Sequence, residues 1–259
     1  MAKEKTSDIK SGTAGQRKAA AKARRQQQKK QQTTILIGVI VVVVVVAVAV
    51  IAYINQPVEI DMPAAFGDYT AVPVSVTEQG YFRLGDPDAP VQMEEFSNFR
   101  CVHCGELHKT LKGRLIDSYI KDGTLSVVYV PLVNDSVSML GAQAALCAGQ
   151  QDPIKFWEMH DVLFSWLDAG FTFGQGHVSA AAERLGLDTG AFGACLGDEA
   201  VHNVLQAAID EANLRGVEGT PAIFFNGERP TCGGGDSKCE GNLPYELIAQ
   251  NIEQRLAGR

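Results

Sequence analysis

Residues 91–104 read VQMEEFSNFRCVHC, an apolar run that leads directly into two cysteines separated by two residues. The run Val91–Phe96 predicts a short strand, and the residues that follow it predict a helix. At the start of a helix, unpaired N–H groups and the positive end of the helix dipole stabilise a thiolate. We therefore expect Cys101 and Cys104 to exchange disulfides, with a protonated His103 as a second positive partner.

The same two cysteines also suit half of a tetrahedral zinc site, which needs two further ligands. Cys232 and Cys239 have six residues between them in a glycine-rich loop, and His103 lies inside the motif itself. The sequence has no glycine-rich phosphate loop, and its histidines show no ligand spacing. We therefore expect a redox-active disulfide with no metal, nucleotide, haem or other cofactor.

The N-terminal fifth of the chain differs from the rest in charge and hydropathy. Residues 1–33 carry ten Lys or Arg against two acidic residues, which predicts a disordered basic tail. Residues 34–54 contain the uncharged run Ile35–Ile54, and its 20 residues are enough, at about 1.5 Å each, to span a hydrocarbon core of about 30 Å. The net charge of -7 is therefore +8 before this run and -15 after it.

Because basic residues remain on the cytoplasmic side of a membrane, this asymmetry predicts a single-pass protein of the cell membrane. Its N-terminus would be cytoplasmic and its C-terminal domain extracytoplasmic. A cleaved signal peptide is the main alternative, since Ala47-Val48-Ala49 has the small-x-small pattern, but the apolar run continues past it. The basic tail would also suit nucleic acid or lipid, although a topology signal explains it without a partner, so no nucleic acid is expected.

Residues 55–79 have scattered Pro, Gly and acidic residues and no sustained period, so we interpret them as a linker. Residues 80–259 form one α/β domain of about 180 residues, which is large enough for a core of its own. Within it, strands at Val91–Phe96 and Leu125–Val130 flank a helix from Cys101 to about Lys121, which predicts a parallel βαβ unit. The helix is predicted from apolar residues that recur every four positions: Leu107, Leu111, Leu115 and Tyr119.

The second half of this domain begins with a helical insertion at about 136–215, which carries few β signals and four helical stretches, at 139–148, 154–166, 178–185 and 199–215. A strand at Ala222–Phe225 follows it. Asn226-Gly227 then predicts a hairpin with a short returning strand near Glu228–Thr231, and a last helix covers roughly Pro244–Ala257. These elements predict a small sheet with helices on both faces.

Six cysteines outside the membrane would meet an oxidising compartment, where an even count favours pairing. Fifteen connectivities are formally possible. Proximity in the sequence favours the Cys101–Cys104 and Cys232–Cys239 pairs, which leaves Cys147 for Cys195. We interpret Cys232–Cys239 and Cys147–Cys195 as structural disulfides.

With its segments in this order, the chain from about residue 80 to 259 resembles the DsbA family, including its membrane-anchored members. The stretch Phe96–Cys104 resembles that family's active site, Leu84–Val91 its lead-in turn, and Val217–Pro221 its cis-proline loop. The surroundings of Cys147 and Cys195 resemble the paired cysteines of some members' insertions. The resemblance implies a thioredoxin fold with a helical insertion, preceded here by one transmembrane helix.

The resemblance also implies roles for the cysteine motif. Cys101 would be the exposed nucleophile that forms the mixed disulfide, and Cys104 the buried thiol that resolves it. His103 would tune the Cys101 thiolate. The residue between Cys101 and His103 is Val102, where the family usually has proline, so the strength of oxidation is not fixed by the resemblance.

Three further residues take roles from the same resemblance. Pro221 would follow a cis peptide bond and lie against the two cysteines, and the backbone of Thr220 would pair with an extended substrate strand. Glu95 occupies the place of a buried carboxylate that could take the Cys104 proton; the alternative is an ordinary strand residue facing water. Besides Val102, the loop Cys232–Cys239 departs from the family's pattern. We interpret it as a loop closed by a structural disulfide, and the alternative is a second redox pair.

The resulting expectation is a membrane-anchored thiol oxidase that donates its Cys101–Cys104 disulfide to reduced exported proteins. Its implied partner is a quinone-linked membrane reoxidant of the DsbB or vitamin K epoxide reductase type, because each donated disulfide must be regenerated. Two alternatives stay open: a reductase or isomerase, serving for example cytochrome maturation, and a non-enzymatic anchored binding module in which the bridge is static.

Overall fold

The computed structural model describes residues 6–54, 58–230 and 243–258, which fall into two compact units divided after Pro57. The first unit is one helix, α1 (Thr6–Ile54). Within α1, the stretch Gly15–Tyr53 is long and apolar enough to cross a membrane by its length and composition. Helix α1 also takes in most of the basic segment that we expected to be disordered. Its Ala, Gln, Lys and Arg residues are strong helix formers, and they extend a helix that the apolar run has already nucleated.

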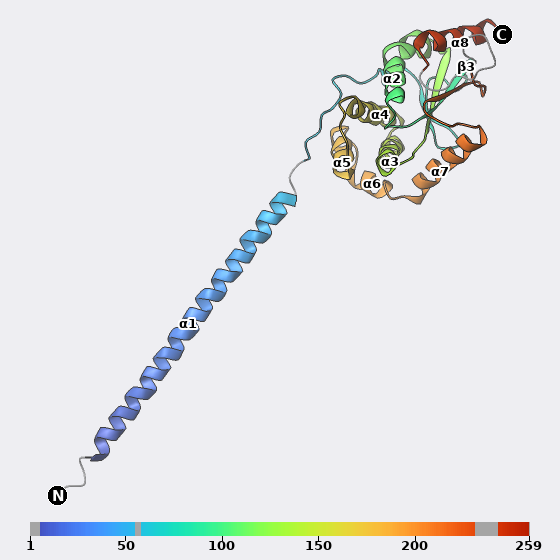
Figure 1. The fold of residues 1–259 in the computed structure, drawn as a ribbon. Helices are drawn as coiled ribbons and strands as arrows, with labels where there is room; N and C mark the ends of the chain where they lie inside the picture. The colour runs from blue at the N-terminus through green and yellow to red at the C-terminus, as the bar shows by residue number, and fades with distance from the viewer. Residues whose placement is uncertain (1–5, 55–57, 231–242, 259) are drawn as a thin grey trace. The chain divides into compact units, whose positions relative to one another are not determined.

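The second unit is built on a mixed five-stranded sheet (Figure 1). Its strands are β1 (Val74–Val76), β2 (Phe82–Leu84), β3 (Val91–Ser97), β4 (Leu125–Pro131) and β5 (Ala222–Phe225). They lie in the order β1-β2-β4-β3-β5. Strands β3 and β4 are parallel, and every other neighbouring pair is antiparallel.

The expected βαβ unit is present in the centre of this sheet. Between β3 and β4 the chain forms α2 (Val102–Thr110), which continues as a π-helical segment, η2 (Leu111–Ile120). Leu107, Leu111 and Leu115 are buried at the four-residue spacing that predicted this helix. The π-helical geometry of its second half has no signal in that spacing.

Between β4 and β5 lies the helical insertion, with one more helix than the sequence predicted. Its helices are α3 (Ser136–Gln151), α4 (Pro153–Asp168), α5 (Gln175–Arg184), α6 (Thr189–Cys195) and α7 (Glu199–Leu214). Helix α6, with seven residues, is too short to show a hydrophobic period. The last element is α8 (Tyr245–Ala257), close to the predicted bounds.

Helices cover both faces of the sheet, as expected, and they enclose two groups of buried side chains. The larger group joins one face to α2, η2, α3, α4 and α8. The smaller group joins the other face to α7 through Ala208 and Ala212. Figure 1 shows α7 on the side of the sheet away from α2 and α3. The alternate residues of β5 divide accordingly, with Phe225 in the larger group and Phe224 in the smaller.

Two local expectations differ from the structure. The segment expected to be a linker joins the folded unit from Val58 onward, because Tyr69 and Val72 bury their side chains in the larger core before β1 begins. The returning strand after Asn226–Gly227 is reduced to one isolated bridge between Phe225 and Glu228. Residue 231, the last of that expected strand, lies outside the described residues.

Candidate active site

Cys101 lies at the N-cap of α2, in extended backbone conformation, and its sulfur takes the place of a capping side chain. The sulfur accepts a hydrogen bond from the backbone N–H of Cys104 at 3.3 Å. Cys104, one turn into the helix, is fully buried, whereas Cys101 is half-buried and faces solvent in part. The two sulfurs therefore differ in access, with Cys101 the one that another molecule can reach.

The same geometry sets the acidity of Cys101. Its pKa is lowered to about 5, first by a hydrogen bond from the Cys104 thiol and also by the Thr220 side chain. The backbone N–H groups of Cys104 and His103 add to this, while partial burial opposes it. The first turn of α2 thus favours the Cys101 thiolate mainly through the Cys104 thiol, with a smaller contribution from the backbone N–H groups that the sequence analysis invoked.

The contribution of His103 comes through its backbone N–H. Its side chain is exposed, and its imidazole is not among the principal causes of the low Cys101 pKa. A tuning role for the His103 imidazole therefore stays a prediction.

Cys104 has the opposite environment. Burial raises the pKa of its thiol far above the ordinary value, and the hydrogen bond to Cys101 and the charge of Glu95 act in the same direction. A Cys104 thiolate released inside the protein therefore needs a proton from a nearby group.

Glu95 on β3 is such a group. Its side chain is 1% exposed, and its Oε1 has no hydrogen-bond partner in the part of the chain that the structure describes. Burial raises the pKa of Glu95 to about 7, opposed by a hydrogen bond from Ser97. Its neighbour Glu94 lies on the opposite face of β3 and pairs with Arg215 at 2.8 Å. The structure therefore excludes the alternative in which Glu95 faces water.

The loop before β5 meets the cysteines from the other side. The Thr220–Pro221 peptide bond is cis, as the resemblance implied. The Cys101 thiol donates a hydrogen bond to the Thr220 carbonyl oxygen at 3.2 Å. Next to this contact is a groove of about 240 Å³, lined by Asn98, Leu132, Val133, Asn134, Ile209, Ala212, Asn213 and Val217–Thr220. The groove offers an apolar surface beside the accessible sulfur.

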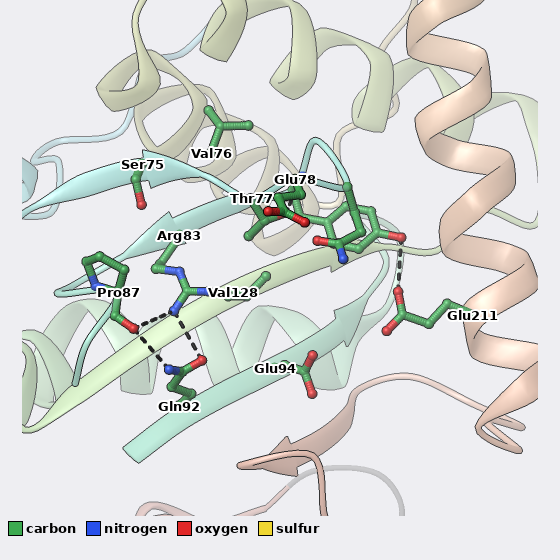
Figure 2. Close-up of a pocket in the computed structure, with 12 residues that line it drawn as sticks. Ser75, Val76, Thr77, Glu78, Arg83, Pro87, Gln92, Glu94, Val128 and Glu211 are labelled. Carbon is green, nitrogen blue, oxygen red and sulfur yellow. Dashed lines mark hydrogen bonds between the residues drawn. The ribbon is translucent and has the colours of Figure 1, made fainter. Parts of the chain in front are cut away.

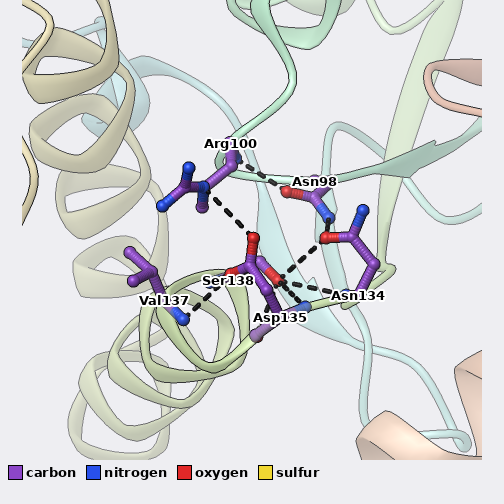
Figure 3. Close-up of polar contacts among 6 residues, drawn as sticks. All are labelled: Asn98, Arg100, Asn134, Asp135, Val137 and Ser138. Carbon is purple, nitrogen blue, oxygen red and sulfur yellow. Dashed lines mark hydrogen bonds and ion pairs between the residues drawn. The ribbon is translucent and has the colours of Figure 1, made fainter.

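A polar network that the sequence analysis missed holds the turn before Cys101 (Figure 3). Asn98 Oδ1 accepts the Arg100 N–H at 2.7 Å, and Asn98 Nδ2 donates to Asn134 Oδ1 at 3.1 Å. Arg100 also pairs with Asp135, 3.3 Å away, whose carboxylate caps α3. The turn that presents Cys101 is thereby tied to the first helix of the insertion.

A separate hollow of about 440 Å³ lies over the sheet between β2 and α7 (Figure 2). Arg83 donates to Gln92 at 3.2 Å on its floor, and the Tyr81 hydroxyl donates to Glu211 at 3.2 Å on its wall. Neither Cys101 nor its helix lines this hollow. It is therefore not part of the thiol centre.

The other four cysteines lie outside the thiol motif. Cys147 on α3 and Cys195 on α6 form a disulfide, the pairing that the sequence predicted. The expected Cys232–Cys239 pair lies outside the described residues.

Known proteins share both the sequence pattern and the fold of this chain. A family model described as "Thioredoxin" matches residues 77–237, more than half of the chain. Disulfide bond formation protein D of Bacillus subtilis (strain 168) is 25% identical over 185 residues, which make up 68% of this chain and 77% of that protein. The crystal structure of oxidised BdbD from Bacillus subtilis shares the fold, with a TM-score of 0.57 and 20% identity over 72% of this chain and 98% of that one.

A different kind of relative matches the same chain. Na(+)/H(+) antiporter NhaA 3 of Salinispora tropica is 33% identical over 150 residues, which are 56% of this chain but 21% of that protein. The chain spans about a quarter or less of the antiporter relatives that it matches.

Proposed function

This chain belongs to the thioredoxin family, and from that membership and the geometry of Cys101 and Cys104 we propose that it is a thiol:disulfide oxidoreductase. In the proposed reaction it donates the Cys101–Cys104 disulfide to reduced proteins outside the cytoplasm. The observation that carries the proposal is the difference between the two thiols. Cys101 is accessible and acidic, while Cys104 is buried and weakly acidic.

Donation takes two exchange steps. A substrate thiolate attacks the Cys101 sulfur, a mixed disulfide forms, and the Cys101–Cys104 bond breaks with its electron pair left on Cys104. A second substrate thiolate then attacks the substrate sulfur of the mixed disulfide and displaces the Cys101 thiolate. The substrate leaves with one disulfide, and the two cysteines keep the two electrons as a dithiol.

The low pKa of Cys101 favours this direction of electron flow. A stabilised Cys101 thiolate is a good leaving group in the second step. Stabilising the reduced form also makes the disulfide a stronger oxidant, as in oxidising members of this chemistry. The same feature argues against a reductase, which needs a less stable dithiol.

Glu95 supplies the proton that the first step requires. The Cys104 thiolate forms in a buried site where it cannot persist as a charge, and a carboxyl with a pKa of about 7 holds a proton near neutral pH. On reoxidation the proton returns to the Glu95 carboxylate.

The groove beside Thr220 supports an unfolded protein as substrate. An extended segment placed there would bring its cysteine to Cys101 and its backbone to the cis-proline loop, while Leu132 and Val217 contact its apolar side chains. Such recognition depends on backbone and general apolarity, so it suits many sequences.

Helix α1 supports placement at the cell membrane. Its apolar part would span the bilayer, and the basic residues before it favour a cytoplasmic N-terminus with the thiol domain outside. A quinone-linked membrane reoxidant of the DsbB or vitamin K epoxide reductase type would then restore the disulfide without any other cofactor.

Two cysteine variants test the proposal. The full chain in detergent should oxidise a reduced, unfolded test protein, and Cys101→Ser should abolish this. Cys104→Ser should accumulate mixed disulfides through Cys101, visible on non-reducing gels. His202→Gln, an exposed change on α7, serves as the matched control and should keep full activity. Normal oxidation by the Cys101 variant would reject this mechanism, whereas no oxidation by the wild-type chain would favour the anchored binding module.

A further inference from the structure

Two histidines and an aspartate meet in the core between α2 and α4. None of them belongs to the thiol motif. They are His108 on α2 and His160 and Asp161 on α4, and all three are buried. One nitrogen or oxygen of each lies within 4.8 Å of the others. No sequence spacing predicted this cluster, because its two histidines come from different helices.

His160 has an unusual environment for a buried polar side chain. It is 0% exposed, and neither of its ring nitrogens has a hydrogen-bond partner among the described residues. Its ring lies within an aromatic enclosure formed by Phe99, His108, Tyr129, Phe156, Trp157 and Phe164. Nδ1 of His108 likewise has no hydrogen-bond partner within residues 6–54, 58–230 and 243–258. Buried polar atoms are nearly always paired, so these nitrogens indicate a missing ligand.

We propose that His108, His160 and Asp161 form a binding site for a divalent transition-metal ion, with Zn²⁺ the best fit. Two imidazoles and one carboxylate are a ligand set that zinc accepts. Three atoms no more than 4.8 Å apart lie within about 2.8 Å of a common point, and zinc bonds to N and O are about 2.0–2.2 Å. Rotamer shifts of less than about 1 Å would therefore close the site.

The carboxylate of Asp161 is already held in place by groups behind it. The Tyr69 hydroxyl donates to Oδ1 at 2.5 Å, and the Gly67 N–H donates to Oδ2 at 2.9 Å. Hydrogen bonds of this kind fix the orientation of a metal ligand. They also tie the segment before β1 to the site, which accounts for the burial of Tyr69.

Lys112 is the competing cation. Its Nζ lies 3.2 Å from Asp161 Oδ2, and His108 Nε2 lies 3.3 Å from Oδ1. The Lys112 side chain is 27% exposed and borders an open cavity of about 370 Å³ that His108 and Asp161 also line. This cavity gives an ion a path from solvent to His108 and Asp161, with room for a water ligand. Lys112 would have to leave both Asp161 and the Ala65 carbonyl oxygen, to which its Nζ also donates, and the cavity offers space for that movement.

A bound ion would join α2 to α4, and therefore the helix that starts at Cys101 to the insertion. The cysteines are not ligands of this site. Metal binding at the site is thus separate from disulfide exchange and survives or fails independently of it.

The test is a metal titration of the full chain in detergent, purified without a histidine tag, stripped with chelator and fully oxidised so that no thiol competes. Co²⁺ is the probe, with Zn²⁺ as competitor. We expect one equivalent of Co²⁺ to give visible d–d absorption without the thiolate charge-transfer band, and Zn²⁺ to displace it. Absence of saturable Co²⁺ and Zn²⁺ binding by the wild-type chain would overturn the proposal.

Three variants assign the site. His160→Gln should weaken binding at least tenfold, and His202→Gln, on the exposed face of α7, should leave it unchanged. Lys112→Gln removes the competing cation from a partly exposed position, so binding should tighten several-fold in a protein that stays folded. Binding that is unchanged by His160→Gln, or weakened by Lys112→Gln, would contradict the assignment.

Discussion

The thiol of Cys101 lies 3.2 Å from the carbonyl oxygen of Thr220, although 119 positions separate the two residues. Two distant segments therefore form the site: the start of α2 supplies the sulfur, and the loop before β5 supplies a backbone acceptor. We therefore expect a substrate cysteine that reaches Cys101 to lie beside Thr220, where the substrate backbone could pair.

The proton role of Glu95 predicts a pH profile. Glu95→Gln should slow donation at pH 6 by at least about tenfold, since a positioned general acid typically contributes a larger factor. In the wild type, donation corrected for the ionisation of the substrate thiol should fall as pH rises through about 7, where Glu95 loses its proton. Stopped-flow oxidation of a reduced peptide measures both. A variant with the wild-type profile would remove Glu95 from the reaction.

Stability gives an independent check on Glu95. Its folded pKa of about 7 lies above the ordinary 4.5, so the folded state binds more protons between these values. Stability of the reduced protein should therefore fall as pH rises from about 4.5 to 7 and then level off. Urea unfolding at pH 8 should find Glu95→Gln more stable than wild type by about 2–3 kcal/mol. Equal or lower stability would mean that the carboxyl is not penalised by burial.

The turn before Cys101 should depend on Asn98. Asn98→Ala removes the acceptor for the Arg100 N–H and the contact to Asn134. We expect a loss of about 1–2 kcal/mol in unfolding free energy. Arg100→Gln is the matched control, because its ion pair with Asp135 is largely exposed and should be worth less than about 0.5 kcal/mol. Equal losses in the two variants would contradict a specific role for Asn98.

The Cys147–Cys195 bridge should act on stability alone. It closes a loop with a sequence separation of 48 residues between α3 and α6. Replacing both cysteines by alanine should therefore cost about 2–5 kcal/mol in urea unfolding. The pKa of Cys101 and the oxidation rate of the folded variant should stay at wild-type values. A changed Cys101 pKa would show that the bridge also shapes the active site.

Electron flow can be read from the reduction potential. If the stabilised Cys101 thiolate makes an oxidant, the Cys101–Cys104 couple should lie nearer to about -120 mV than to about -270 mV. Equilibration of the oxidised chain with glutathione buffers measures it. A potential near the lower value would favour the reductase or isomerase alternative.

The sequence predicted the central part of the fold because its signals there are strong and local. Val91–Phe96 and Leu125–Val130 have enough apolar and β-branched residues to identify as strands, and the helix between them has a clear four-residue period. Strands β1 and β2 were missed because three residues cannot show alternation. Their place at the edge of the sheet depends on pairing with β4, which is tertiary information.

At the site, the cysteines were predictable from their spacing, but their surroundings were not. Glu94 and Glu95 are adjacent acids, and only the pairing of β3 with its neighbours decides which one is buried. Likewise, His108 and His160 are unremarkable in the sequence, and they meet only because α2 packs against α4. Contacts between distant elements carry no local pattern.

The account depends most directly on the acidity of Cys101. Ultraviolet titration of the thiolate in the reduced chain, compared with Cys101→Ser to identify the group, measures its pKa. We predict a midpoint near 5 that disappears in the variant. A midpoint near the ordinary value of 9, or one that persists without Cys101, would contradict the central claim.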